Sequence, residues 1–363
     1  MPNLIGDFAN GKRHTICLHS KCQLIILNPV MQFPEVSYLR ELSHSRQNSP
    51  GELIGVVDFG YVPIALGDAI TIMVNMNAKA FETKSKNLRL YLVADGGKFN
   101  HQHHINGVTY FQYINNILPV FSCSPTLTSL HLMHSRKNLD AFIFALHLQG
   151  KTVWPGYELY ARRNLDYYSH HYLNSFFKKN GFIPKIICPR GYENQVDGFF
   201  DRYLKNKFVV SVNIRQRQFM SDHAQLERDS PIDQWYRFFD LVAQKYPNVV
   251  FVNLGGYTEW DRDLARKSNV VIPRILGLGL GEEIGVLLKA NLFMGTSSGF
   301  AAGATFSDVP YVITNYERAV APRVGINIGD NYPFANKHQT ISWERESTGL
   351  LMSLFEEKFR QLK

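Results

Sequence analysis

Residues 291–317 read NLFMGTSSGFAAGATFSDVPYVITNYE and hold the pattern that decides the fold. A short apolar run ends in Gly-Thr-Ser-Ser-Gly, a segment of small residues with helical spacing follows, and a β-branched run comes after Asp-Val-Pro. This pattern predicts a strand over 292–295, a helix over 298–306 and a second strand over 309–315. A strand, a helix and a strand in this order form the repeating unit of a parallel α/β sheet.

The same alternation extends toward the N-terminus of this stretch and beyond its C-terminus. Further strands are predicted at 208–215, 249–256 and 269–274, with helices at 230–247, 258–268, 282–290 and 345–361. Strands that alternate with helices in this way indicate a doubly wound parallel sheet.

The first half of the chain shows the α/β pattern in a less regular form. It predicts a strand over 53–59, a helix over 69–81, and strands over 88–95 and 184–191. Because 363 residues exceed the usual size of one domain, we expect two.

The polar stretch 195–207 marks the expected boundary between these domains. We therefore expect an N-terminal Rossmann-like domain over 1–200, a C-terminal one over 201–345 and a final helix over 346–363.

The composition narrows the classes of partner. The formal net charge of +8 favours an anionic ligand or a membrane surface, and no basic tract is dense enough to predict nucleic-acid binding.

The four cysteines are too scattered for a disulfide framework or a zinc site. The first residues, MPNLIGDFANGKRH, lack the apolar core of a signal peptide, and no apolar run reaches about 18 residues. We expect a cytoplasmic protein, with peripheral attachment to the inner face of a membrane left open.

Candidate site residues follow the predicted strands, because ligands of doubly wound sheets bind beyond the carboxyl ends of the strands. At a period of two residues, Asn213, Arg215 and Arg217 share one face, and two guanidinium groups on one face match a phosphate. The pair Gly255-Gly256 would let a ligand approach the backbone. The candidate diphosphate-binding residues are Asn213, Arg215, Arg217, Asn253, Gly255, Gly256, Arg274, Glu283, Gly295, Thr296, Ser297, Ser298 and Gly299.

The loop 295–299 runs directly into a predicted helix. A helix N-terminus carries unpaired N–H groups and a partial positive charge, and the glycines would let a phosphate come close. Two interpretations of the hydroxyl groups stay open, since they either cap the helix or bind the phosphate. The loop lacks the G-x-G-x-x-G spacing of dinucleotide sites, and the chain has no G-x-x-x-x-G-K-[ST], so neither a nicotinamide site nor a P-loop is predicted.

The run EEIGVLLKANLFMGTSSGFAAGATFSDVPYVITN resembles the donor-binding half of GT-B glycosyltransferases. It is most similar to a group of uncharacterised bacterial glycosyltransferases. VNIRQRQ is more distantly similar to the donor loop of fucosyltransferase-like enzymes, with Asn213 in place of a histidine and no aspartate after the arginines. The resemblance covers about residues 205–317. It implies two Rossmann-like domains facing across a cleft, with the nucleotide-sugar donor on the C-terminal domain and the acceptor on the N-terminal one.

The resemblance implies transfer of a hexosyl or deoxyhexosyl group from a nucleotide-diphosphate sugar to a glycan, lipid-linked or other hydroxyl acceptor. Synthesis of bacterial surface polysaccharide is the expected setting. No metal is expected, because side chains would neutralise the leaving diphosphate. Two alternatives remain open: a nucleotide-sugar epimerase of similar two-domain build, and a non-catalytic module that binds a nucleotide or a sugar.

An inverting transfer needs a general base that takes the proton of the acceptor hydroxyl. Glycosyltransferases of the heptosyltransferase type carry a Gly-Asp pair after an early strand, which implies Gly67 and Asp68 on the acceptor side, with Asp68 as the base. The alternative is that Asp68 is a helix N-cap. Asp58 and Asp95 also follow strands and are rival candidates.

Overall fold

The computed structural model describes residues 15–18, 22–26, 51–60, 62–93, 109–133, 136–137, 139–155, 170–216, 228–256 and 260–363. Two of the candidate residues, Asp95 and Arg217, lie outside these ranges. The chain divides into two compact units. The first comprises Met1–Ile64, Asn75–Asn116 and Ser124–Tyr168, and the second comprises Ala65–Val74, Ile117–Cys123 and Ser169–Lys363.

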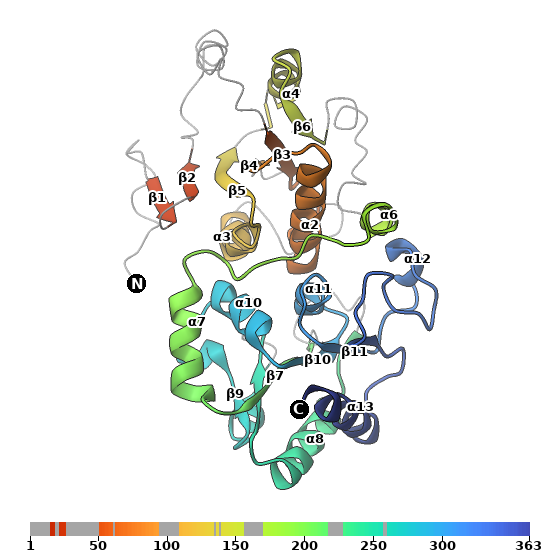
Figure 1. The fold of residues 1–363 in the computed structure, drawn as a ribbon. Helices are drawn as coiled ribbons and strands as arrows, with labels where there is room; N and C mark the ends of the chain where they lie inside the picture. Colours follow the sequence, from red (N-terminus) through yellow and green to blue (C-terminus); the bar gives the residue numbers. More distant parts are fainter. Residues whose placement is uncertain are drawn as a thin grey trace. The chain divides into compact units, whose positions relative to one another are not determined.

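The first unit is built on a six-stranded sheet in the order β1-β2-β5-β4-β3-β6 (Figure 1). Its strands are β1 (Thr15–Leu18), β2 (Cys22–Ile26), β3 (Glu52–Asp58), β4 (Asn87–Val93), β5 (Leu127–Met133) and β6 (Thr152–Trp154). The β1–β2 pair is antiparallel and the other pairs are parallel. Helix α4 (Leu139–Leu148) contributes Phe142 and Ile143 to a core cluster with Ile54 and Val56 of β3.

Helix α2 (Leu66–Glu82) follows β3 and is buried on every side over its middle turns, which include the polar residues Thr71, Asn75 and Asn77. Residues 69–78 are all buried, as expected of a helix inside a core. Gly55 of β3 permits its close approach, because a Cβ there would lie 2.9 Å from Met76 Sδ and from Leu90 Cδ1. The connection from β4 to β5 ends with helix α3 (Tyr110–Phe121).

The second unit has a six-stranded sheet in which every pair is parallel. Its strands are β7 (Phe208–Asn213), β8 (Val249–Asn253), β9 (Val270–Val271), β10 (Leu292–Thr296), β11 (Tyr311–Thr314) and β12 (Gln339–Ile341). The order β12-β11-β10-β7-β8-β9 is the 3-2-1-4-5-6 order of the Rossmann fold, with β7 as its first strand. The chain reverses direction across the sheet between β7 and β10, and this switch point is where such sheets bind ligands.

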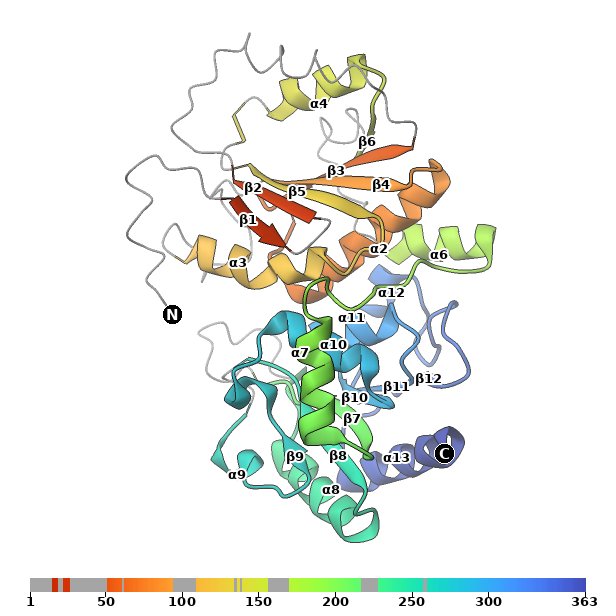
Figure 2. The same ribbon diagram turned by 60° about the vertical axis from the view of Figure 1, so that its left-hand side comes forward.

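The helices from residue 170 onward belong to the second unit. They are α6 (His170–Asn180), α7 (Glu193–Phe199), α8 (Ile232–Lys245), α9 (Arg262–Ala265), α10 (Leu280–Lys289), α11 (Gly299–Thr305), α12 (Ala321–Val324) and α13 (Thr348–Leu362), with a π-helical turn at Phe200–Leu204 and a 3-10 turn at Pro273–Leu276. Figure 2 shows α8 beside α13, and the core between them contains Trp235, Phe238, Phe251 and Phe355.

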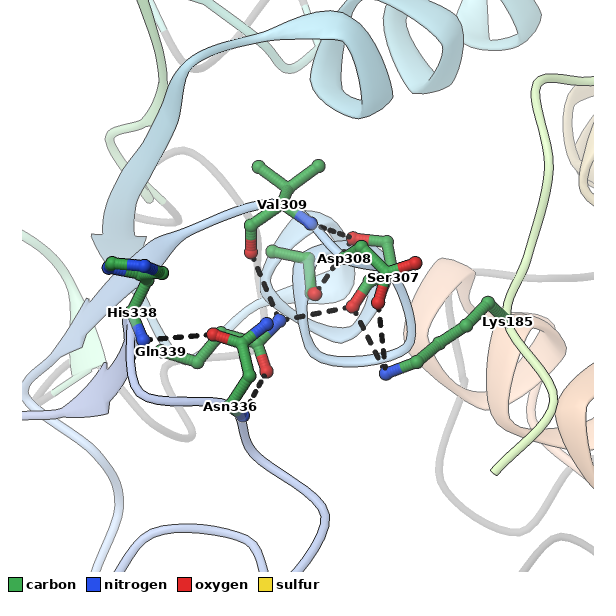
Figure 3. A network of polar contacts seen from close by, with 8 residues as sticks. Lys185, Ser307, Asp308, Val309, Asn336, His338 and Gln339 are labelled. Carbon is green, nitrogen blue, oxygen red and sulfur yellow. Dashed lines mark hydrogen bonds and ion pairs between the residues drawn. The ribbon is translucent and has the colours of Figure 1, made fainter. Parts of the chain in front are cut away.

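A buried amide ties the start of β12 to the loop before β11 (Figure 3). The Gln339 Nε2 group donates to the carbonyl oxygens of Ser307 and Val309, each at 3.0 Å. Its Oε1 atom accepts from the Asn336 N–H at 3.0 Å. Lys185 adds a further hydrogen bond to the Ser307 carbonyl, at 3.2 Å. One side chain therefore satisfies backbone groups in the segments before β11 and before β12.

The predicted α/β class is confirmed, and most strands and helices after residue 207 occur within a few residues of their expected bounds. The strand predicted at 184–191 is wrong, since this segment has no ladder. Pro184 and Pro189 carry no N–H to donate, and Ile186 N–H instead donates to the Phe306 carbonyl at 3.0 Å. The polar stretch 195–207 is largely helical, because α7 continues into the π-helical turn.

Candidate functional site

The switch point of the second sheet brings two of the predicted segments together. Asn213 at the end of β7 is buried, and its Nδ2 donates to the Leu254 carbonyl at 2.7 Å. Gly295 of β10 pairs with Asn213. A Cβ on Gly295 would lie 2.7 Å from the Asn213 carbonyl oxygen, so this close contact of two strands requires glycine. The carboxyl ends of β7 and β10 therefore form one edge, as the sequence predicted.

The hydroxyl groups of the loop 295–299 serve the protein itself. Ser298 is the N-cap of α11, and its Oγ accepts from the Ala301 N–H at 3.3 Å. Thr296 is fully buried and its Oγ1 lies 3.5 Å from the Arg228 carbonyl oxygen. The capping interpretation therefore describes Ser298 in this structure, and Ser297 and Ser298 are both partly exposed.

Arg228 brings a positive charge to this loop that the sequence-based prediction missed. Its Nη2 donates to the Ser297 carbonyl at 2.7 Å and lies 3.4 Å from the Ser297 Oγ. Its Nε is 3.3 Å from Oε2 of Glu317, which follows β11. Its position in the sequence could have identified it as a candidate. Arg228 lies just before the predicted helix at 230–247, and a residue that leads into a helix after a strand lies at the same sheet edge as the end of that strand.

Arg215 also lies at this edge, two residues beyond β7. It is 6% exposed, and its carbonyl oxygen accepts from the Ser230 N–H at 3.0 Å. Arg217 lies outside the described residues, so its place relative to Arg215 stays a prediction.

A second group of candidates meets at the end of β8. Glu283 of α10 is fully buried and binds Arg274 through two contacts, Nε–Oε2 at 2.9 Å and Nη2–Oε2 at 2.7 Å. Its Oε1 accepts from the Gly255 N–H at 3.1 Å. Asn253 is buried at the end of the strand, and Gly256 is exposed. This arrangement neutralises the Arg274 charge and holds the Gly255 turn, whose φ of 147° suits glycine.

The acceptor-side candidates lie against the loop 295–299 inside the second unit. A Cβ on Gly67 would be 3.5 Å from Gly299 Cα, and a Cβ on Gly299 would be 2.6 Å from Leu66 Cβ. The first turns of α2 and α11 are therefore in contact. Asp68 lies within the first turn of α2, since the helix begins at Leu66, three residues before the predicted start.

Asp58, the rival base, is held by an arginine in the first unit. It is fully buried, and Arg136 donates to it through Nε at 2.9 Å and Nη2 at 2.7 Å. The Gly60 N–H adds a third hydrogen bond at 2.8 Å. These bonds engage both carboxylate oxygens with groups of the protein itself, so this geometry disfavours Asp58 as a general base for an acceptor.

Among the described residues, no group of three or more His, Cys, Asp or Glu side chains is arranged to hold a metal ion. No helix among them is both long enough and apolar enough to cross a bilayer.

Comparison with known proteins identifies the fold. No protein-family model matches this sequence, and no curated protein matches it. A solved glycosyl transferase family 9 protein from Veillonella parvula DSM 2008 is similar at a TM-score of 0.55 and 12% identity, over 86% of this chain and 98% of that chain. The E. coli ADP-heptose lps heptosyltransferase II is similar at a TM-score of 0.51 and 10% identity, over 86% and 98% of the two chains. This chain therefore has the fold of these glycosyltransferases, the GT-B fold with two Rossmann-like domains.

Proposed function

We propose that this protein is a glycosyltransferase that moves a sugar from a nucleotide-diphosphate sugar to a hydroxyl group of a glycan or lipid-linked acceptor. One observation carries the proposal: two arginines lie at the switch point of a Rossmann-type sheet, beside a glycine-containing loop. The fold supports it, because the two solved structures that share this fold are named as glycosyltransferases, one of them for ADP-heptose.

The chemistry proposed for the site follows from its charges. Arg228 and Arg215 would bind the diphosphate and stabilise the negative charge that develops on it as the bond to the sugar breaks. Asp68 would accept the proton of the acceptor hydroxyl as that oxygen attacks the anomeric carbon. The contact between Gly67 and Gly299 supports this assignment, because it brings the helix that carries Asp68 to the loop beside the two arginines.

The partners and the metal requirement belong to the same proposal. Two cationic side chains would take the place that a divalent metal has at other diphosphate sites, so chelation with EDTA is expected to leave nucleotide binding unchanged. The net charge of +8 fits an acceptor presented at an anionic membrane surface.

A thermal-shift panel with ADP, GDP, UDP, CMP and TDP tests the donor site. A nucleotide at a concentration of about 100 times its Kd stabilises the folded state by about 2.7 kcal/mol, which raises the melting temperature. If none of the five nucleotides changes the melting temperature, the proposed donor site is refuted.

Arg228→Gln tests the diphosphate assignment. A charge-assisted hydrogen bond contributes about 1.5–3 kcal/mol, so the affinity for the best nucleotide should fall about 10- to 150-fold. Arg237→Gln, an exposed arginine on α8, is the matched control and should bind as the wild type does. Equal affinities in the two variants would remove Arg228 from the site.

A further inference from the structure

Glu346 is a buried carboxyl group beside the carboxyl end of β11, and none of the chemistry above uses it. Its side chain is 4% exposed. Its Oε1 lies 3.1 Å from Ser230 Oγ and 3.1 Å from Thr314 Oγ1. Its Oε2 is buried and has no hydrogen-bond partner among the residues that the structure describes.

The number of hydroxyl hydrogens near Glu346 bears on whether its side chain carries a proton. Thr314 Oγ1 lies within hydrogen-bond distance of two acceptors, Glu346 Oε1 at 3.1 Å and the Gly295 carbonyl oxygen at 3.2 Å. A threonine hydroxyl has one hydrogen, so an ionised Glu346 and the Gly295 carbonyl must share it. A proton on Glu346 Oε1 resolves this, because the acid then donates to Thr314 Oγ1 while Thr314 donates to Gly295.

Burial of the Glu346 Oε2 atom also favours the protonated form. An ionised carboxylate would leave half of its charge on Oε2 with no hydrogen bond, and unpaired buried charge is costly. In the neutral acid this oxygen is a carbonyl group, whose burial costs less. Both the hydrogen count and the missing partner favour the protonated form.

The neighbours of Glu346 belong to the edge that forms the proposed donor site. Ser230 N–H donates to the Arg215 carbonyl at 3.0 Å, and Gln216 Nε2 donates to the Ser230 carbonyl at 2.7 Å. Thr314 bonds the Gly295 carbonyl at the start of the donor loop. Glu346 thus joins the segments on both sides of the switch point through two hydroxyl groups.

We propose that Glu346 is a positioning residue that carries a proton in the folded protein, and that it holds the Arg215 and Gly295 segments in the geometry that binds the donor diphosphate. Its ionisation breaks the hydrogen-bond chain that runs from Glu346 through Thr314 to the Gly295 carbonyl, and it adds a negative charge at the edge that is proposed to bind the diphosphate. Donor binding is therefore strongest while Glu346 is neutral. The donor part of this inference rests on the proposed function, whereas the protonation does not.

Burial sets the direction of the Glu346 titration and raises the pKa of this carboxyl group above its ordinary value of 4.5. Hydrogen bonds from its own backbone N–H, from Ser230 and from Thr314 lower the pKa by less, as does the charge of Arg345. Among the described residues, the charged groups within three positions of Glu346, Ser230 or Thr314 in the chain are Glu344, Arg345, Arg228, Asp229, Asp233 and Glu317. Because the folded-state pKa is raised, the stabilisation is complete below pH 4.5 and is lost as the pH rises through the folded-state pKa.

Urea unfolding of the full chain across a pH series tests the protonation without any ligand. Glu346→Gln is the neutral isostere and keeps both hydrogen bonds. Above pH 4.5, the folded-to-unfolded ratio of the wild type should fall relative to that of E346Q by about tenfold per pH unit, and level off above the folded-state pKa. Infrared difference spectra of wild type minus E346Q should show the C=O stretch of a carboxylic acid at low pH and lose it over the same interval.

Two further variants separate the effect of Glu346 protonation from the effect of any change of charge or loss of hydrogen bonds in this segment. Glu344→Gln changes an exposed carboxylate on the same segment and should follow the wild-type profile. Glu346→Ala leaves Ser230 and Thr314 without their partner and should be less stable than E346Q at every pH. Parallel pH profiles for the wild type and E346Q would overturn the proposed protonation.

Calorimetric titration with ADP at each pH tests the link to the donor site. Wild-type affinity should fall as Glu346 ionises, and E346Q should keep its affinity over that interval. If ADP binds equally well at every pH while the stability profiles diverge, the positioning role is refuted. If the stability profiles coincide and ADP still binds, the inference about Glu346 fails while the proposed function stands.

Discussion

Replacement of Gly299 by alanine tests the contact between the first turns of α2 and α11. The added Cβ would lie 2.6 Å from Leu66 Cβ, 2.8 Å from its Cγ and 3.0 Å from its Cδ2. Favourable carbon–carbon contacts lie at about 3.5–4.0 Å, so one helix must move by roughly 1 Å. The partners are the backbone-proximal atoms of a leucine, which cannot turn away by a change of rotamer alone.

The expected effect combines two opposing terms. Inserting a methyl group into a close-packed contact costs about 1–3 kcal/mol. Alanine also favours a helix over glycine by up to about 1 kcal/mol, which reduces the loss. We expect Gly299→Ala to lower the free energy of unfolding by about 1–2 kcal/mol, and to weaken nucleotide binding because the shift displaces the loop that ends at Ser298.

Urea unfolding measured beside a matched control checks this expectation. Gly349→Ala in α13 adds the same methyl group where no atom lies within 4 Å, so it should be neutral or stabilising by up to about 1 kcal/mol. Leu66→Ala in the Gly299→Ala background should relieve the overlap and give a favourable coupling of about 1 kcal/mol in the double-mutant cycle. Additive effects of the two substitutions, or a Gly299→Ala variant as stable as the wild type, would refute the contact.

Three further expectations concern single side chains. Asp68→Asn should retain nucleotide binding and lower the rate of sugar transfer about 10²- to 10⁴-fold, and unchanged transfer would move the base elsewhere. Asp58→Asn should destabilise the first unit by about 3–5 kcal/mol because it leaves Arg136 unmatched, with an exposed Asp140→Asn as the control that loses little. Burial lowers the pKa of His170 to about 4, so its neutral form stabilises the fold above pH 6.5. As the pH falls toward 4, the free energy of unfolding should decrease by about 3 kcal/mol at most. In His170→Phe, urea unfolding should show a smaller decrease over this interval, and equal decreases in the variant and the wild type would contradict the expectation.

Local patterns predicted much of the second unit because each element carries its own signal. Helix α8 has a proline before its first turn and apolar residues at helical spacing, and β7 and β8 are rich in valine and phenylalanine. Strands β1, β2 and β12 were not predicted, and β1 and β12 lie at the edges of their sheets. β2 joins its sheet by pairing with β5, which lies far along the chain, and such a contact leaves no local pattern.

The candidate site was predictable as far as strand ends reveal it. The segments after β7, β8 and β10 were expected at one edge, and the structure places Asn213, Gly255 and Gly295 there. Arg228 was missed because its partner, the Ser297 carbonyl, is 69 residues away. Glu346 was missed for the same reason, since Ser230 is separated from it by 116 residues. Neither separation leaves a local pattern in the sequence.

The strand order of the second unit also governs when the proposed donor edge can form. β7 is flanked in the sheet by β8, the next strand in the chain, and by β10. The side chain of Asn291, directly before β10, accepts from the Val209 N–H across 82 residues. During synthesis, β7 and β8 can pair early, whereas the other side of the switch point does not exist until β10 and β11 have left the ribosome. A nascent chain that ends before residue 314 lacks part of this edge, so nucleotide binding would report that the unit has completed its fold.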